Sequence, residues 1–338
     1  MLVHDSTPHA SASGAANQAG SFISTPMKPA LSFAEQVRRM RSHGLVVDDE
    51  DEAIHFLSEA NYYRIRGYWL TFEHNGKLDA GTTLDDIREV YRLDEELRLW
   101  LWAAIGQVEI KARTAFAYHL SMACGPLAHE DQKYFDDQKA HAKTIRSYER
   151  EKSRAQRDGV PCVVHNMSKY GDLPLWAAVE IMTMGNVSRL YGNLSDAASY
   201  AGGRTVSKAV ADEFKIKPYH LKSWLQHLTY VRNLCGHHNR IYNRTVTTRA
   251  TLLKADSKYQ GSKAFPTFLV LMRIYEKLWP KQWERMAQRL GDIVSRHPSV
   301  SLRPLGFPED WKTILSVPST QERPRPGLLA RMKRFLCG

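Results

Sequence analysis

Apolar side chains recur at helical spacing through residues 84–123, and no proline interrupts them. A period of about 3.6 residues is typical of a helix that buries one face. Thr83 and Asp86 form a helix-start pattern just before this run, and Gly125 ends it. The pattern predicts one very long helix, or two helices broken near Gly106, as the spine of the fold.

Shorter helices are predicted on both sides of this spine from their start and stop signals. Ser32 and Glu35 form a capping box for a first helix that ends at Gly44. Asp48 is expected to cap the next helix, over residues 49–60. Strand-like alternation is sparse, so we expect an all-α chain. The other predicted helices cover residues 175–194 after Pro174, a segment from Pro218 into the 230s, residues 266–279 and residues 280–295.

The chain has 338 residues, enough for more than one domain. Residues 1–26 are rich in Ser, Ala, Gly and Thr without an apolar period, which predicts a disordered tail. We expect a helical region over residues 27–250, further helices over 251–318 and a basic tail over 319–338.

Several features predict a cytoplasmic protein without a membrane partner. The sequence has no run of 18 apolar residues and no signal-peptide pattern at its start. The four cysteines stand far apart, which favours free thiols over a disulfide framework or a zinc ribbon. No cofactor and no metal are expected.

Net charge is +11, which favours an anionic partner such as nucleic acid, with membrane binding as the competing explanation for the basic charge. Residues 204–249 hold nine Lys and Arg against two acids and form a local positive patch. A basic run at residues 139–157 is either a second contact with RNA or, as is more common, a solvated helix face. The candidates for binding RNA phosphates are Lys215, Lys217, Lys222, Arg240 and Arg244.

Residues 61–72, NYYRIRGYWLTF, interleave aromatic and basic side chains. Such a mixture can stack on and clamp single-stranded RNA. It can also fill the space between helices, because large aromatic side chains are mostly buried. We favour the buried interpretation for Tyr63, Tyr68 and Trp69, with Gly67 making a bend.

Residues 231–244, VRNLCGHHNRIYNR, carry an R-x4-H pattern made by Arg232 and His237. Arg can hold a phosphate and neutralise the charge that grows in the transition state. His can take or give a proton at cellular pH, because its unperturbed pKa is roughly 6.5. Asn233 can orient either group. Metal-free cleavage of an RNA phosphodiester needs side chains of these kinds.

The spacing of Arg232 and His237 requires the helix to end between them. Five positions correspond to about 140° around an ideal helix, so an unbroken helix would separate the two side chains. Gly236 offers an end that lets His237 and His238 turn toward Arg232. His238 is therefore an alternative proton carrier, and Glu180, on the preceding predicted helix, is a further candidate for support. Two adjacent histidines without other ligands do not predict a metal site.

Arg113 and His119 make a second pattern, R-x5-H, inside the long predicted helix. On an unbroken helix these two side chains face different sides. We favour a structural role in which Arg113 pairs with Glu109 one turn away. A second active site at this position remains the alternative.

Six blocks of the sequence follow one another in an order that suggests a family. They are KPALSFAEQVRRMRSHGL, NYYRIRGYW, TTLDDIREVYRLDEELR, EIKARTAFAYHLS, LPLWAAVEIMTMGNVSRLY and VRNLCGHHNRIYNR. Over roughly residues 28–250 the chain resembles the Abi-like abortive-infection proteins (the AbiD/AbiF group), whose core belongs to the HEPN superfamily. The resemblance implies a HEPN-like helical bundle, antiviral defence against phage and toxin-like endoribonuclease activity. It also implies that Arg232 and His237 are the catalytic pair, with Asn233 as polar helper, at a dimer or domain interface.

The sequence thus predicts a metal-independent endoribonuclease, a hydrolase that leaves a 2′,3′-cyclic phosphate. Its expected partners are an RNA substrate, a second copy in a homodimer, and an RNA or protein antitoxin. Two alternatives remain: a non-catalytic RNA-binding or phage-sensing protein of the same fold, and a protein that docks a phage component.

Overall fold

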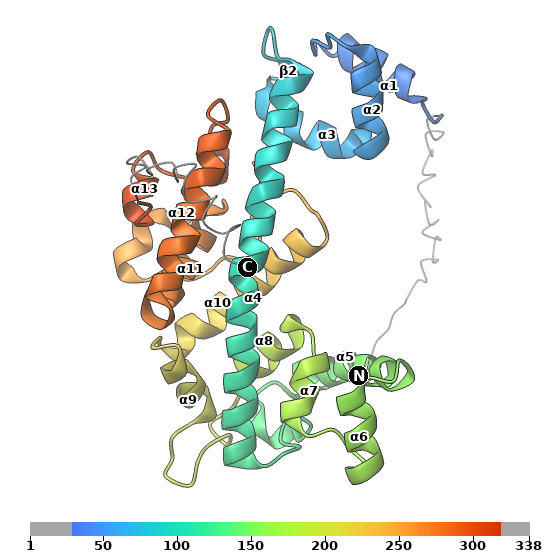
Figure 1. Cartoon of the computed structure of the whole chain (residues 1–338). Helices are drawn as coiled ribbons and strands as arrows, with labels where there is room; N and C mark the ends of the chain where they lie inside the picture. The colour runs from blue at the N-terminus through green and yellow to red at the C-terminus, as the bar shows by residue number, and fades with distance from the viewer. Residues whose placement is uncertain (1–28, 319–338) are drawn as a thin grey trace, which may run out of the picture.

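One helix, α4 (Leu84–Cys124), runs for 41 residues through the middle of the molecule (Figure 1). In this computed structural model, which describes residues 29–318, α4 is a single element about 60 Å long at 1.5 Å per residue. Thr83 and Asp86 close a capping box at its start, where the Asp86 N–H donates to Thr83 Oγ1 over 3.1 Å. Gly125, at φ +100°, ends it. The long helix is confirmed, and it does not break at Gly106.

The first helices gather near the amino-terminal end of α4 (Figure 1). Ser32 and Glu35 form the predicted capping box of the first helix. The second helix is capped by Asp49 and not by Asp48, because the Asp49 carboxylate accepts the Glu52 N–H at 2.9 Å. The elements here are α1 (Phe33–Ser42), α2 (Glu50–Glu59), α3 (Tyr62–Trp69), η1 (Leu70–Phe72) and an antiparallel hairpin of β1 (Glu73–His74) and β2 (Lys77–Leu78).

A second group of helices packs near the other end of α4 (Figure 1). The predicted single helix over 175–194 is wrong: it is two helices, because Thr183 starts a new one through a capping box with Asn186. Helices α6 and α9 are additional to those predicted. The group contains η2 (Gln132–Tyr134), α5 (Gln138–Arg157), α6 (Pro161–Tyr170), α7 (Leu175–Ile181), α8 (Met184–Gly192) and α9 (Val206–Glu213).

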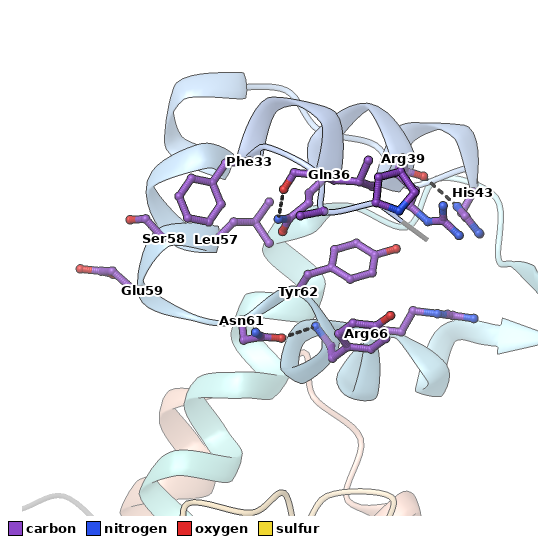
Figure 2. A pocket seen from close by; sticks show the side chains of 14 residues that line it. Phe33, Gln36, Arg39, His43, Leu57, Ser58, Glu59, Asn61, Tyr62 and Arg66 are labelled. Carbon is purple, nitrogen blue, oxygen red and sulfur yellow. Dashed lines mark hydrogen bonds between the residues drawn. The ribbon is translucent and has the colours of Figure 1, made fainter. Parts of the chain in front are cut away.

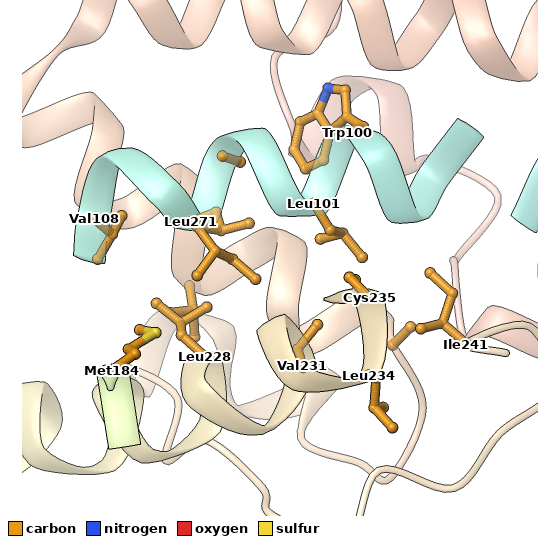
Figure 3. Packing of buried hydrophobic residues seen from close by; sticks show 14 of the residues in the cluster. Trp100, Leu101, Val108, Met184, Leu228, Val231, Leu234, Cys235, Ile241 and Leu271 are labelled. Atoms are coloured by element: carbon orange, nitrogen blue, oxygen red, sulfur yellow. The ribbon is translucent and has the colours of Figure 1, made fainter. Parts of the chain in front are cut away.

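Helix α10 (Pro218–Gly236) packs against both α4 and α8. Pro218 occupies its first turn, as predicted, where a missing N–H costs no intrahelical bond. Figure 3 shows side chains of α10 interleaved with those of α4 and α11. The apolar stripe of α10 is buried in full: Leu221, Trp224, Leu225, Leu228 and Val231.

The helices after α10 share the same core. Trp100 Nε1 on α4 donates to the Met286 carbonyl over 2.9 Å, and Tyr275 Oη donates to the Ala104 carbonyl over 2.8 Å. The predicted helices over 266–279 and 280–295 are confirmed within a residue or two. The elements are η3 (Lys254–Tyr259), α11 (Phe265–Leu278), α12 (Pro280–Arg296), η4 (Arg303–Leu305) and α13 (Trp311–Ile314).

The described residues therefore form an all-α fold around α4, with one short hairpin. Cys124, Cys162 and Cys235 are free thiols. Within residues 29–318, no helix combines the length and apolar character needed to cross a membrane. The tails predicted over 1–26 and 319–338, together with Cys337, lie outside the described residues.

Candidate active site

The R-x4-H segment occupies the last turn of α10 and the turn that follows. The helix ends at Gly236, as predicted, and His237 is its C-cap. His238 adopts the left-handed conformation, at φ +54°, and the Asn239 N–H bonds back to the Leu234 carbonyl over 2.8 Å. This is the hydrogen-bond pattern of a Schellman turn, with His238 and not Gly236 in the left-handed position.

Trp102 on α4 organises the contact between this turn and the long helix. The Arg232 guanidinium lies over the Trp102 ring, 4.6 Å from its centroid. Gly236 leaves room for the same ring, since a Cβ at this position would lie 2.6 Å from Trp102 Cζ3. The Arg232 side chain remains 32% exposed, so its guanidinium is held in place but still open to a ligand.

Glu109 on α4 is shared by two arginines. Arg232 Nε lies 3.4 Å from Glu109 Oε2, and Arg113 pairs with Glu109 Oε1. Arg113 also donates to the main-chain carbonyls of Val179 and Met182. The Glu109 carboxylate is largely buried, and the two cations compensate its charge. The predicted pairing of Arg113 with Glu109 is confirmed, and the arginines of both R-x-H patterns meet at one acid.

Buried Asp94 anchors the chain immediately after the motif. Its carboxylate accepts the N–H of Ile241 at 3.1 Å and that of Tyr242 at 2.7 Å. It also accepts the Tyr68 hydroxyl at 2.7 Å and pairs with Arg98. Burial and the negative charge of Asp94 raise the pKa of Tyr68, so this phenol stays a hydrogen-bond donor. The sequence does not single out Asp94, although it predicts that Tyr68 is buried.

Helix α3 contacts residues 236–240, which end α10 and form the turn after it (the motif turn). Arg64 Nη1 donates to the His238 carbonyl over 2.5 Å, and Arg240 donates to the Gly67 carbonyl. Arg240 also lies 5.8 Å from the centroid of Tyr68. The predicted bend at Gly67 is wrong: Gly67 lies inside α3, where a Cβ would approach Arg240 Nε to 3.4 Å. Residues 61–72 (the aromatic block) therefore contact the motif turn directly through hydrogen bonds.

The aromatic block divides between core and surface. Tyr68 and Trp69 are buried, as predicted. Tyr63 is 83% exposed, so its predicted burial is wrong. The reason is that α3 packs on the core through the side that carries Tyr68 and Ile65, while Tyr63 lies on its outer side.

The remaining motif side chains stand at the surface. Asn233 Oδ1 lies 3.4 Å from Arg232 Nη1, whereas His237 and His238 are exposed. Within residues 29–318, no hydrogen bond or ion pair joins either imidazole to Arg232. Glu180, exposed near the end of α7, likewise makes no such contact with the motif in this part of the chain. One chain thus presents Arg232 and two histidines at one helix end, without direct contact between them.

Arg113 and His119 are not brought together. His119 Nδ1 lies 2.8 Å from Tyr200 Oη, and its Nε2 lies 3.6 Å from Glu213 Oε1. Burial lowers the pKa of His119, although Glu213 opposes that shift. Because Arg113 faces Glu109 and α7 instead, the two side chains face different partners, as expected for an unbroken helix.

The candidate phosphate-binding residues lie in two places. Lys217 caps the start of α10, about 22 Å along the helix axis from Arg232, and Lys222 is also exposed. Lys215 and Lys277 each donate to the other's carbonyl, over 3.4 and 2.8 Å. Arg244 is half-buried beyond the motif turn, and Arg240 is engaged with α3.

Two further observations describe the chemical groups around the motif. Burial raises the pKa of the Cys235 thiol to about 12, so this cysteine inside the motif stays protonated and is a poor nucleophile. Among residues 29–318, no group of three or more His, Cys, Asp or Glu side chains is placed to hold a metal ion.

Comparison with known proteins gives one match. The family model for Abi-like proteins matches residues 55–243, from α2 through the motif turn. The chain belongs to the Abi-like family. This membership suggests a function in abortive infection. No curated protein and no solved structure matches the chain. The matched segment includes Tyr63, Asp94, Glu109 and Arg232.

Proposed function

We propose that this Abi-like protein is a metal-independent endoribonuclease of the HEPN type, acting as a toxin-like effector in antiphage defence. The observation that carries the proposal is the end of α10. There Arg232, held on Trp102 beside the buried Glu109, shares one turn with two exposed histidines. A fixed but accessible cation next to imidazoles suits a reaction that moves a proton while negative charge grows on phosphate.

RNA supplies its own nucleophile in this reaction. The 2′-oxygen attacks the adjacent phosphorus while His237 removes the 2′-hydroxyl proton. The bond between phosphorus and the 5′-oxygen breaks, and a second imidazole gives that oxygen a proton. Arg232 stabilises the anionic phosphorane, and Glu109 positions Arg232. The products are a 2′,3′-cyclic phosphate and a 5′-hydroxyl.

A homodimer would supply the second imidazole and complete the site. Leu99, Trp102 and Ile110 on α4 are exposed by 66, 42 and 62%. At 100° per residue these three side chains lie within about 80° of one another and form an apolar stripe beside Arg232. Contiguous exposed apolar surface of this kind favours contact with another protein. A second copy in a C2 arrangement would cover the stripe and bring two motif turns to one cleft.

Leu99→Glu is therefore expected to convert the dimer into a monomer and to lower cleavage at least tenfold at low protein concentration. Like charges would meet across the two-fold axis, and Leu99 lies about 15 Å along α4 from Glu109, the acid that contacts Arg232. Sedimentation velocity with parallel cleavage assays measures both effects. Leu127→Glu, a matched change at an exposed leucine outside the stripe, should alter neither. A fully active monomeric wild type would contradict the dimer.

Lys215, Lys217 and Lys222, near the start of α10, are expected to bind RNA through its phosphates. In a His237→Ala background, replacing Lys215, Lys217 and Lys222 with alanine should flatten the dependence of affinity on salt. The slope should fall by up to about 0.7 for each phosphate that the variant no longer binds. Cut-site choice should not change, because these lysines lie far from Arg232. Lys281→Ala on α12 is the control. An unchanged slope in the triple variant would mean that these three lysines do not bind RNA.

Cleavage of cellular RNA by the purified chain in EDTA tests the function itself. Fragments should end in a 2′,3′-cyclic phosphate and begin with a 5′-hydroxyl. RNA binding without cleavage would select the non-catalytic RNA-binding alternative, and neither binding nor cleavage would reject both.

A further inference from the structure

A partly open cavity of about 1230 Å³ lies between α1, α2 and α3 (Figure 2). It exceeds the roughly 300–1000 Å³ typical of sites for small molecules. Its wall is both aromatic and basic, with Phe33, Arg39 and His43 from α1 and its C-cap, and Tyr62, Tyr63 and Arg66 from α3. A cavity of this size and openness suits a segment of a polymer better than an enclosed metabolite.

Tyr63 is the most exposed large aromatic side chain in the described residues, at 83%. Its ring meets Tyr62 edge-on at 5.8 Å between centroids, and Tyr62 meets buried Trp69 edge-on at 6.0 Å. These contacts support Tyr63 from one side and leave it open on the other. A supported aromatic face open to solvent is the usual platform for a nucleobase.

The charge of the cavity favours an anion. Arg39 forms no ion pair with a carboxylate within residues 29–318, whereas Arg66 is paired with Glu73 at 2.9 Å and lies over Trp69. The acidic side chain at the cavity edge, Glu59, lies 3.6 Å from the imidazole of His55. Among the described residues that line the cavity, Arg39 is therefore the cation that remains available to a phosphate.

Helix α3 connects this cavity to the candidate active site. Tyr63 and Arg66 face the cavity, while Arg64 and Gly67 on the adjoining side bond to His238 and Arg240. The two sites are thus separated by about one helix diameter, roughly 10–12 Å. A strand bound at the motif turn can reach the cavity within a few nucleotides.

We propose that this cavity binds an unpaired nucleobase of the RNA that the motif turn cuts. Tyr63 stacks on the base and Arg39 binds a neighbouring phosphate. The proposal rests on the proposed function for its choice of ligand. It adds a selection rule: a base reaches Tyr63 only where RNA is single-stranded, because paired bases are stacked within the helix.

Binding of short RNA to the full chain, in a His237→Ala background, tests this proposal. The probes are a twelve-nucleotide oligoadenylate, an abasic ribose-phosphate oligomer of the same length, a duplex RNA and adenosine monophosphate. Tyr63→Ala should weaken oligoadenylate binding about five- to 100-fold and the abasic oligomer less than twofold. Tyr63→Trp should retain binding, because it keeps an aromatic face. Tyr219→Ala, at an exposed tyrosine on α10, is the matched control.

The outcomes separate this proposal from the nuclease. If wild type cuts RNA but Tyr63→Ala binds oligoadenylate normally, the base site is wrong and the nuclease stands. If Tyr63→Ala loses oligoadenylate selectively while wild type never cuts RNA, the base site stands and the nuclease is wrong. Equal losses for the abasic oligomer, or adenosine monophosphate binding as tightly as the strand, would overturn the base site. A wild-type chain that binds no RNA would overturn both.

Discussion

Arg232→Ala is expected to lower RNA cleavage by roughly 10²- to 10³-fold or more, the usual effect of removing a preorganised group that stabilises transition-state charge. The free energy of unfolding should fall by only about 1 kcal/mol. The interaction of Arg232 with Trp102 is a partly exposed cation–π pair, and Glu109 keeps Arg113 as its partner, so no buried charge is left alone. Cleavage rates and thermal unfolding of the same preparations measure the two quantities.

His237→Ala should have a similar effect, about 10²- to 10⁴-fold, if this imidazole moves the proton. Its side chain is exposed at a helix C-cap, so stability should hardly change. Arg249→Ala, at an exposed arginine of the same basic segment, is the matched control and should cut normally. Activity in His237→Ala combined with a dead His238→Ala would transfer the role to His238. If Arg232→Ala and both histidine variants cut RNA normally, the nuclease itself is rejected.

The contacts of Arg113 indicate a role for the second pattern, Arg113 and His119, that the spacing of these two residues does not suggest. Arg113 holds Glu109 by an ion pair and is itself anchored by two main-chain carbonyls of the α7 region, and Glu109 in turn contacts Arg232. In the proposed mechanism Arg113 is thus a positioning residue for Arg232. His119 instead contacts Tyr200 and Glu213.

Helix boundaries could be predicted here wherever their signals are local. Ser32, Thr83 and Pro218 each act within one turn of their own position, so each of these helix starts is predictable. The same logic applies to the missed break between α7 and α8. Thr183 and Asn186 form a capping box whose pattern is visible in the sequence, although the apolar period on both sides obscures it.

Whether an aromatic side chain is buried or exposed could not be predicted in the same way. Tyr63 and Tyr68 belong to one block, yet one is exposed and the other buried, because only one side of α3 meets α4. The residues of the candidate site could likewise be predicted only in part. Arg232 and His237 stand out through a local pattern, whereas Glu109 and Asp94 reach the motif from α4, across a separation for which sequence spacing carries no signal.

Asp94→Ala is expected to destabilise the protein by about 3–5 kcal/mol, the typical cost of breaking a buried ion pair by removing one partner. The Arg98 side chain is only 5% exposed and would keep its charge without a carboxylate. The Tyr68 hydroxyl and the N–H groups of Ile241 and Tyr242 would lose an acceptor in the same step. Urea unfolding measures the change.

The control separates the buried network from charge on α4 in general. Asp85 lies on the same helix with an exposed carboxylate that pairs with Arg88, so Asp85→Ala should cost no more than about 1 kcal/mol. A destabilisation of about 1 kcal/mol or less in Asp94→Ala would mean that the network does not hold the fold. If the network does hold it, Asp94→Ala should also cut RNA poorly under conditions where it is still folded. The reason is that Asp94 binds the chain directly after the motif turn, so its loss should let that turn, which carries His237 and His238 in the proposed active site, change its position.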